Sequence, residues 1–182
     1  MIGNDIIDLN LARKDSNWQR KGFLEKQFSK QEQDAIQSAS NSFLKVWLFW
    51  SMKEAVYKIY TQKAQQRFFA PLKFECFLTN ENQGYVCFEE QTFFTTSCIN
   101  ENYLYTFASE NEAEVTSTIC APNQIENGIR KSIQKRTGIK VADLEKRKDL
   151  IGAPQFFFQE KLVTRSCTIT HHGNYGAFAF VL

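Results

Sequence analysis

The chain changes character at Pro71, and this change constrains its fold more than any other feature. Before it, residues 43–63 carry the pattern of one long helix, which Asn41 or Ser42 would cap. After it come four short segments rich in aromatic and β-branched residues, separated by Asn, Gly and Glu turns, at 73–78, 85–88, 92–96 and 103–108. Such segments are typical of an antiparallel meander. The sequence therefore predicts a long helix packed on an antiparallel sheet.

The residues before this helix predict a strand and smaller helices. Residues 2–11 are expected to form a strand that carries Asp5 and Asp8, and residues 15–29 a loop with a short helix. Ser29 and Glu32 have the spacing of a capping box, in which each side chain bonds the backbone N–H of the other. This box would open a further helix that runs through Ile36.

The last third repeats the combination of helix and strands. Residues 114–119 favour one more strand, and Pro122 opens a helix that Gly138 would end near Thr137. Four further strands are expected at 144–148, 155–159, 167–170 and 177–182. We therefore predict an α+β protein with two lobes, residues 1–112 and 113–182, each with helix packed on antiparallel sheet.

Composition excludes a disordered chain and shows segregated charge. The 182 residues are 43% hydrophobic and 14% aromatic, with a net charge of +2. No Lys or Arg occurs from Phe74 to Thr118, whereas residues 121–150 are rich in both. The basic part could meet phosphates or an acidic protein partner, or it could be a solvated helix and loop. Aromatic and basic residues are not interleaved, which argues against nucleic-acid binding.

Cysteine spacing and hydropathy predict a cytoplasmic protein. The five cysteines form no CxxC pair and no metal-finger spacing, as expected of reduced, buried thiols. The first residues are acidic and lack the long apolar run of a signal peptide. No stretch approaches the length of a membrane span, so no membrane partner is expected.

The strongest chemical motif lies in the long helix, from Trp50 to Lys58 (WSMKEAVYK). Glu54 and Lys58 are four residues apart and therefore share one helix face, on or near which Trp47 and Trp50 also lie. A carboxylate and a lysine beside apolar surface could hold a divalent metal and a phosphate together. The alternative is an ordinary helix ion pair that contributes roughly 0.2–0.5 kcal/mol.

Other polar residues could complete such a site. Asp5 and Asp8 are three residues apart, so on a regular strand they face opposite sides. Asp5, Glu54 and a diphosphate would suit Mg²⁺, which prefers a few carboxylates, waters and substrate phosphates. The two histidines, His171 and His172, are adjacent and precede Gly173. A strand end that enters such a turn suits an anion, although a histidine satisfied by the backbone is the alternative.

Three motifs together resemble those of the 4′-phosphopantetheinyl transferase superfamily. They are a G-x-D motif at Gly3-Asn4-Asp5, a W-x-x-K-E-A-x-x-K motif at Trp50 to Lys58, and an S-x-S/T-H motif at Thr168-Ile169-Thr170-His171. The nine-residue central motif is highly specific. Supporting similarity is found at 28–32, 70–74 and 152–154.

The resemblance implies transfer of the 4′-phosphopantetheine arm of coenzyme A to a serine of an acyl or peptidyl carrier protein, with release of 3′,5′-ADP. Asp5 and Glu54 would hold Mg²⁺ on the diphosphate, and Glu54 would accept the serine proton directly or through water. Lys58 would contact the diphosphate. The remaining cofactor contacts would come from Thr170 and His171 at the nucleotide 3′-phosphate, and from Lys53, whose role is less defined.

The order of the motifs resembles that of one branch of the family, whereas the length of the chain is similar to that of another branch. The histidine motif comes last, as in the small holo-acyl-carrier-protein synthases, which are trimers of single lobes. The length is closer to the two-lobe, surfactin-synthetase-activating type. Residues after Pro122 resemble the first lobe of that type, and residues 1 to about 112 its second. We therefore hypothesise a circularly permuted, monomeric enzyme, with a trimer as the alternative.

Departures from the family pattern leave a second class of function open. Ile7 stands where the larger type has a second acid, and Asp8 fits the acid of the small type, which would make metal ligation of the small type. Ala153 replaces the lysine of a G-K-P turn, and a basic-aromatic nucleotide-binding segment has no match before Pro122. Arg130, Lys131 or Lys148 would then compensate. The alternative is a non-catalytic relative that binds coenzyme A, a nucleotide or an acidic carrier protein.

Overall fold

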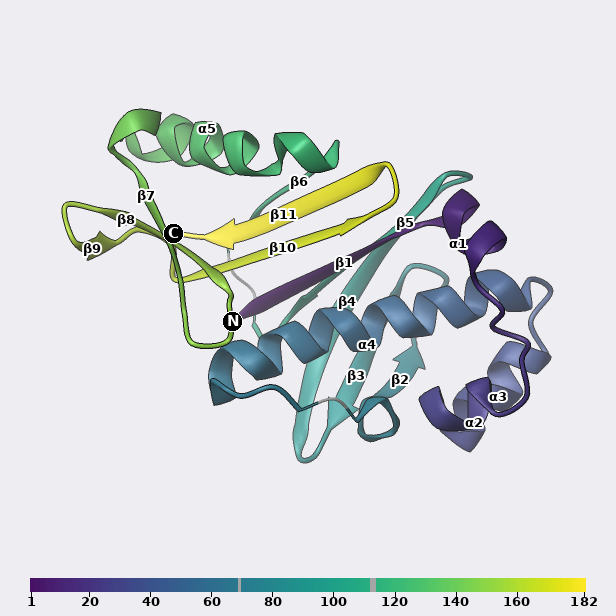
Figure 1. Ribbon diagram of the computed structural model, residues 1–182. Coiled ribbons are helices and arrows are strands. Elements are labelled where there is room, and N and C mark those ends of the chain that lie inside the picture. The colour runs from purple at the N-terminus through teal and green to yellow at the C-terminus, as the bar shows by residue number, and fades with distance from the viewer. Residues whose placement is uncertain (69, 112–113) are drawn as a thin grey trace.

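A 23-residue helix, α4 (Ser42–Ala64), lies across one face of a five-stranded antiparallel sheet (Figure 1). The computed structural model describes residues 1–68, 70–111 and 114–182. The strand order is β1-β5-β4-β3-β2. The sequence-predicted long helix and meander are confirmed, with strands at Ile2–Asp8 (β1), Glu75–Leu78 (β2), Gln83–Phe88 (β3), Gln91–Ile99 (β4) and Tyr103–Ser109 (β5).

The first strand is shorter than predicted. It ends at Asp8 instead of continuing to residue 11, because the Asp8 carboxylate accepts hydrogen bonds from the backbone N–H groups of Asn10 and Leu11 and so begins a helix. The Ser29–Glu32 capping box is confirmed, and Asn41 caps α4. The short helices that precede α4 are α1 (Leu9–Asp15), α2 (Phe23–Gln27) and α3 (Lys30–Gln37), and the 3-10 turn η1 (Pro71–Lys73) follows it.

The rest of the chain forms two smaller sheets. The first has the order β10-β11-β6 and carries α5 (Ile125–Thr137), and the second has the order β7-β8-β9. Gly138 ends α5 with a φ of 78°, a conformation that favours glycine. The strands are Thr116–Cys120 (β6), Glu145–Lys148 (β7), Pro154–Phe158 (β8), Lys161–Leu162 (β9), Ser166–His172 (β10) and Tyr175–Val181 (β11), with 3-10 turns at Pro122–Gln124 (η2) and Val141–Asp143 (η3).

In each part of the chain, the first strand pairs with the last strand. β1 pairs antiparallel with β5, which pairs with β4, and β6 pairs antiparallel with β11, which pairs with β10. These helices and antiparallel sheets agree with the predicted α+β class. The expected boundary between residues 112 and 113 lies outside the described residues.

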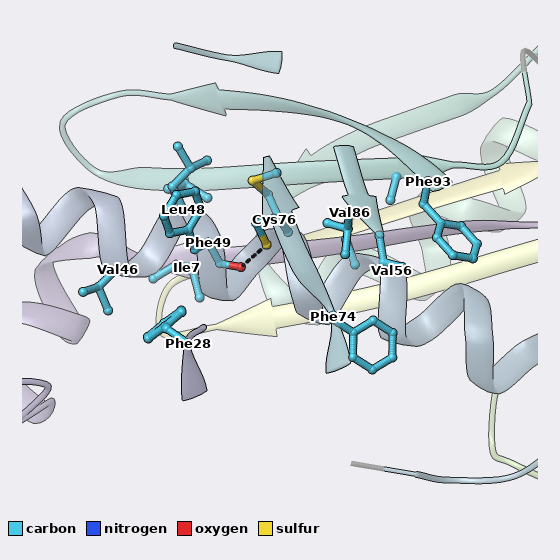
Figure 2. Close-up of a cluster of buried hydrophobic side chains, with 14 of the residues drawn as sticks. Ile7, Phe28, Val46, Leu48, Phe49, Val56, Phe74, Cys76, Val86 and Phe93 are labelled. Atoms are coloured by element: carbon cyan, nitrogen blue, oxygen red, sulfur yellow. Dashed lines mark hydrogen bonds between the residues drawn. The ribbon is translucent and has the colours of Figure 1, made fainter. Parts of the chain in front are cut away.

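The largest apolar core surrounds α4, where Val46, Phe49 and Val56 lie beside Cys76 and Val86 of the sheet (Figure 2). The Cys76 thiol donates to the backbone carbonyl of Phe49, with a sulfur–oxygen distance of 3.5 Å. A second core lies under α5, and a third cluster joins Ile6 and Tyr105 to Ala177 of β11. The two parts of the chain thus share buried surface next to β1.

Gly3 lets β1 approach α4 closely. A Cβ atom at this position would lie 1.9 Å from the carbonyl oxygen of Ala55, so no other residue fits without moving the helix or the strand. This close approach brings Asp5, two residues along β1, toward the face of α4 that carries Glu54 and Lys58.

Candidate active site

Asp5 lies where β1, α4 and β10 meet. Its side chain is buried, and its Oδ1 accepts a hydrogen bond from the Thr170 hydroxyl at 3.1 Å. The same oxygen lies 3.7 Å from the Lys58 ammonium nitrogen. Its other oxygen, Oδ2, is buried without a hydrogen-bond partner among the described residues. One oxygen of Asp5 is therefore held in place and the other remains available for a ligand.

Lys58 connects the three elements. Its ammonium group donates to the backbone carbonyl of Asn4 on β1 at 2.7 Å and to that of Ile169 on β10 at 3.5 Å. About a quarter of the side chain is exposed, at 26%. Lys58 is thus fixed beside Asp5 and still accessible to a ligand.

Glu54 is a partly buried carboxyl group with a strongly shifted pKa. Burial and the nearby charge of Asp5 raise its pKa to about 7, and the opposing charge of Lys58 offsets only part of this. Burial likewise raises the pKa of Asp5, against the opposing effects of Lys58 and the Thr170 hydroxyl. Across the described residues, no side-chain hydrogen bond or ion pair occupies the Glu54 carboxylate.

Asp5 and Glu54 fit a divalent cation. Burial raises the pKa of both carboxyl groups, and the charge of Asp5 raises that of Glu54 further, which marks a site deficient in positive charge. The unpartnered Asp5 Oδ2 supplies a ligand oxygen. Within the described part of the chain, no group of three or more His, Cys, Asp or Glu residues gathers around a possible metal position. A bound Mg²⁺ would therefore take its other ligands from water and substrate phosphates.

Lys53 does not join this site. Its ammonium group donates to Glu32 Oε2 at 2.8 Å and to the carbonyl oxygens of Pro71 and Phe74 at 2.9 and 2.6 Å. These three contacts match the three protons of the group, and the side chain is 3% exposed. The expected cofactor contact of Lys53 is not supported, because adjacent residues on a helix point in different directions and Lys53 faces α3 and η1.

Asp8 also takes a different role from the one expected. Its Oδ1 accepts from the N–H groups of Asn10 and Leu11, and its Oδ2 accepts from the N–H of Asn174 at 3.1 Å. These hydrogen bonds outweigh the effect of burial and lower the pKa of Asp8. Asp8 therefore caps α1 and holds the β10–β11 turn, and a metal role of the small-synthase type finds no support here.

The two histidines separate at the end of β10. His171 is exposed, beside the buried Thr170 that contacts Asp5. His172 lies on the opposite side of the strand, where its Nδ1 accepts from the backbone N–H of Asp8 at 2.9 Å. Of the two, His171 is the more exposed, and His172 is tied to β1 through its Nδ1.

A cavity of about 480 Å³ opens beside Lys58, between α4 and the second part of the chain. Its walls include the turn Gly152-Ala153-Pro154 and the Thr168–Ile169 segment of β10, together with four cationic side chains, Lys58, Arg67, Lys146 and Lys148. Such a large, positively charged cavity suits an anionic ligand.

The cations around the cavity are not equally available. Lys146 is paired with Glu126 at 2.8 Å, whereas Arg67 donates to the backbone carbonyl of Ile151 at 2.9 Å. Neither Arg67 nor Lys148 has a carboxylate partner among the residues the structure describes. Of the expected compensating residues, Lys148 lines the cavity, but Arg130 is bound to Glu126 and to the Leu144 carbonyl.

Arg67 was missed by sequence reasoning. It follows α4 in a segment without a motif, and its position over Gly152 depends on contacts across 84 residues of sequence. The basic region 121–150 is also less open than its composition indicates. Arg136, Lys146 and Arg147 are each paired with a glutamate.

Comparison with known families gives one match, and it covers the part of the chain that carries Asp5 and Glu54. The family model described as the 4′-phosphopantetheinyl transferase superfamily matches residues 1–119. No curated protein matches the chain. Among the described residues, no helix has both the length and the hydrophobicity needed to cross a membrane.

Proposed function

This chain belongs to the 4′-phosphopantetheinyl transferase superfamily, and we propose that it transfers the phosphopantetheine arm of coenzyme A to a serine of an acyl or peptidyl carrier protein. The observation that carries this proposal is the group of Asp5, Glu54 and Lys58, in which the pKa of Glu54 is raised to about 7. A general base works best when its pKa lies near the working pH.

The reaction requires a nucleophile, a base and charge stabilisation. The serine oxygen attacks the phosphorus that carries the pantetheine arm, the bond from that phosphorus to the bridging oxygen breaks, and 3′,5′-ADP leaves. Glu54 accepts the serine proton, directly or through a water molecule. Lys58, fixed to β1 and β10, donates to the diphosphate oxygens as their charge grows.

Asp5 and Glu54 are the residues that would hold Mg²⁺. When bound, Mg²⁺ supplies charge neutralisation at the diphosphate. Asp5 is prepared for this role because the Thr170 hydroxyl and the Lys58 ammonium group fix one of its oxygens and leave the other free.

The cavity beside Lys58 supports a place for the nucleotide end of coenzyme A. Its cations suit the 3′-phosphate and the diphosphate, and Lys58 stands between the cavity and Asp5. Arg67 and Lys148 stand in for the lysine that Ala153 replaces, and the exposed His171, next to Thr170, remains a further candidate for the 3′-phosphate.

The finer architecture is part of the proposal. The common pairing of first and last strand in the two parts of the chain supports two related lobes, and the family match to residues 1–119 supports a family-like first lobe. We propose the circular permutation and a monomer on these grounds, and a cytoplasmic location because the five cysteines are free thiols. Light scattering that gives the mass of a trimer would contradict the monomer.

The test is a transfer assay with the purified protein, Mg²⁺, coenzyme A and a panel of acidic carrier proteins. Mass spectrometry should show the phosphopantetheine adduct on at least one carrier serine, and E54Q should abolish it. A carrier serine-to-alanine variant is the matched control. Absence of an adduct on every carrier of the source organism would overturn the proposal.

A second candidate is a non-catalytic relative that binds coenzyme A or a carrier protein. Ala153 favours it, because a lysine of the family's turn is absent at the cavity wall. Calorimetry that shows coenzyme A binding, together with no adduct on any carrier, would favour this candidate over the transferase.

A further inference from the structure

β1 and β10 lie side by side and run in the same direction, although they belong to different sheets (Figure 1). Among the described residues, the backbone ladder of β1 is with β5 and that of β10 is with β11. The contact between β1 and β10 must therefore be made by side chains.

Every second residue of β10 supplies such a contact. The Ser166 hydroxyl accepts from the N–H of Ile2 at 3.1 Å, and the Thr168 hydroxyl donates to the Asn4 side-chain oxygen at 2.8 Å. Both pairs are separated by 164 residues in the sequence, which is also the separation of His172 and Asp8. One face of β10 thus holds β1 in a fixed, parallel register.

Several contacts fix the C-terminal ends of β1 and β10 relative to each other. His172 Nδ1 accepts from the Asp8 N–H at 2.9 Å, and the Asn174 N–H donates to Asp8 Oδ2 at 3.1 Å. Gly173, with a φ of 55°, leaves room for this arrangement, because a Cβ there would lie 2.4 Å from Asp8 Oδ2. Acceptance at Nδ1 requires a neutral imidazole with its proton on Nε2.

We infer that His172 is a positioning residue that keeps β10 in register with β1, so that Thr170 stays on Asp5. His172 is two residues from Thr170 on the same strand face, and Asp8 is three residues from Asp5 on β1. A slip at the His172–Asp8 contact therefore moves Thr170 and His171 relative to Asp5. This inference rests on the proposed function, in which β10 and β1 both contact coenzyme A.

The acceptor atom of His172 can be replaced by a shorter side chain or misplaced by a longer one. In H172N the side-chain oxygen occupies a place equivalent to Nδ1, whereas in H172Q the acceptor lies one bond farther along. S166A is the control, because it removes a hydroxyl at the opposite end of the same strand face, away from Thr170, where it accepts from the Ile2 N–H and donates to Gln62 Oε1 at 2.9 Å.

Steady-state kinetics of the purified enzyme separate positioning from simple stability. We expect H172Q to raise the KM for coenzyme A about tenfold, the size of one lost hydrogen bond, with the KM for the carrier unchanged. H172N should stay within about twofold of the wild type, and S166A should lower the melting temperature with both KM values unchanged. Equal KM values in H172Q and H172N would overturn the inference. So would an H172Q preparation that contains less active protein and has an unchanged KM.

Hydrogen exchange at the Asp8 amide tests the contact independently of transfer. The amide should be protected in the wild type and in H172N and exchange faster in H172Q. Faster exchange in H172Q without transfer by any variant would mean that the contact exists and the proposed function is wrong. Equal exchange in all three proteins would overturn the inference even where transfer is observed.

Discussion

Replacement of Lys53 by Met decides whether this motif lysine serves the fold or the cofactor. The Lys53 side chain is 3% exposed and its partner Glu32 is 1% exposed. Glu32 also accepts from the N–H groups of Ser29 and Cys76, so its carboxylate is committed to this position. Met has a similar length and no charge, and it therefore leaves Glu32 as a buried charge without its counterion.

The cost follows from this burial. Removal of one partner of a buried ion pair typically costs about 3–5 kcal/mol, a large part of the roughly 5–15 kcal/mol that stabilises a domain. K53M also leaves the Pro71 and Phe74 carbonyl oxygens without their donor. The double variant K53M/E32Q, which removes both charges, should recover part of the loss.

Urea unfolding followed by circular dichroism measures the free energy, and transfer kinetics measure the function of the molecules that remain folded. We expect K53M to lose about 3–5 kcal/mol of unfolding free energy and to keep the wild-type KM for coenzyme A. The matched control, K58M on the same helix, should lose transfer activity with a smaller loss of stability. A K53M protein that is stable to within about 1 kcal/mol and binds coenzyme A tenfold more weakly would refute the structural role.

Glu54 should make the stability of the free protein depend on pH, because its folded-state pKa is about 7 against an ordinary value of 4.5. As pH rises from 4.5 to 7, the unfolded chain releases this proton and the folded chain keeps it. The free energy of unfolding should therefore fall over this range by roughly 1–3 kcal/mol relative to E54Q. If urea unfolding gives the same pH dependence of this free energy for both proteins, the shifted pKa is contradicted. R67A and K148A should each raise the KM for coenzyme A about tenfold and change the KM for 3′-dephospho-coenzyme A less, with K131A on the exposed face of α5 as the control. Equal changes in the KM values of the two substrates would show that neither Arg67 nor Lys148 contacts the 3′-phosphate. G3A should lower the free energy of unfolding by about 3 kcal/mol or more, since its Cβ would lie 1.9 Å from the Ala55 carbonyl oxygen. A melting temperature equal to that of the wild type would show that β1 and α4 can move apart without loss of stability.

The parts of the fold that sequence predicts are those with local signals. α4, the Ser29–Glu32 capping box, the meander and the Gly138 stop are each specified by residues within a few positions of one another. α1 was missed because Asp8 is both the last residue of a strand and a helix cap, and its capping contacts are visible only in three dimensions.

The site was predictable in its residue types and not in its contacts. The motifs indicate Asp5, Glu54 and Lys58, but the Lys53–Glu32 pair joins two helices, and the contacts of Thr170 and His172 span more than 160 residues. Arg67 reaches the cavity through a contact with a distant turn. Tertiary packing, which no local pattern records, decides all of these.

Two pairs of adjacent residues show how backbone geometry divides structural from functional roles. Successive side chains on a helix turn by about 100°, so Lys53 is bonded to Glu32 of α3 while Glu54 lies close enough to Asp5 of β1 for the charge of Asp5 to raise its pKa. Successive side chains on a strand turn by about 180°, so His172 faces β1 while His171 is exposed. In each pair the member that is bonded to a neighbouring element fixes the element that carries the other member. Variants of Lys53 should therefore cost stability and spare the site, whereas variants of His172 should move Thr170 and His171, and H172N, which keeps the acceptor atom, should restore them.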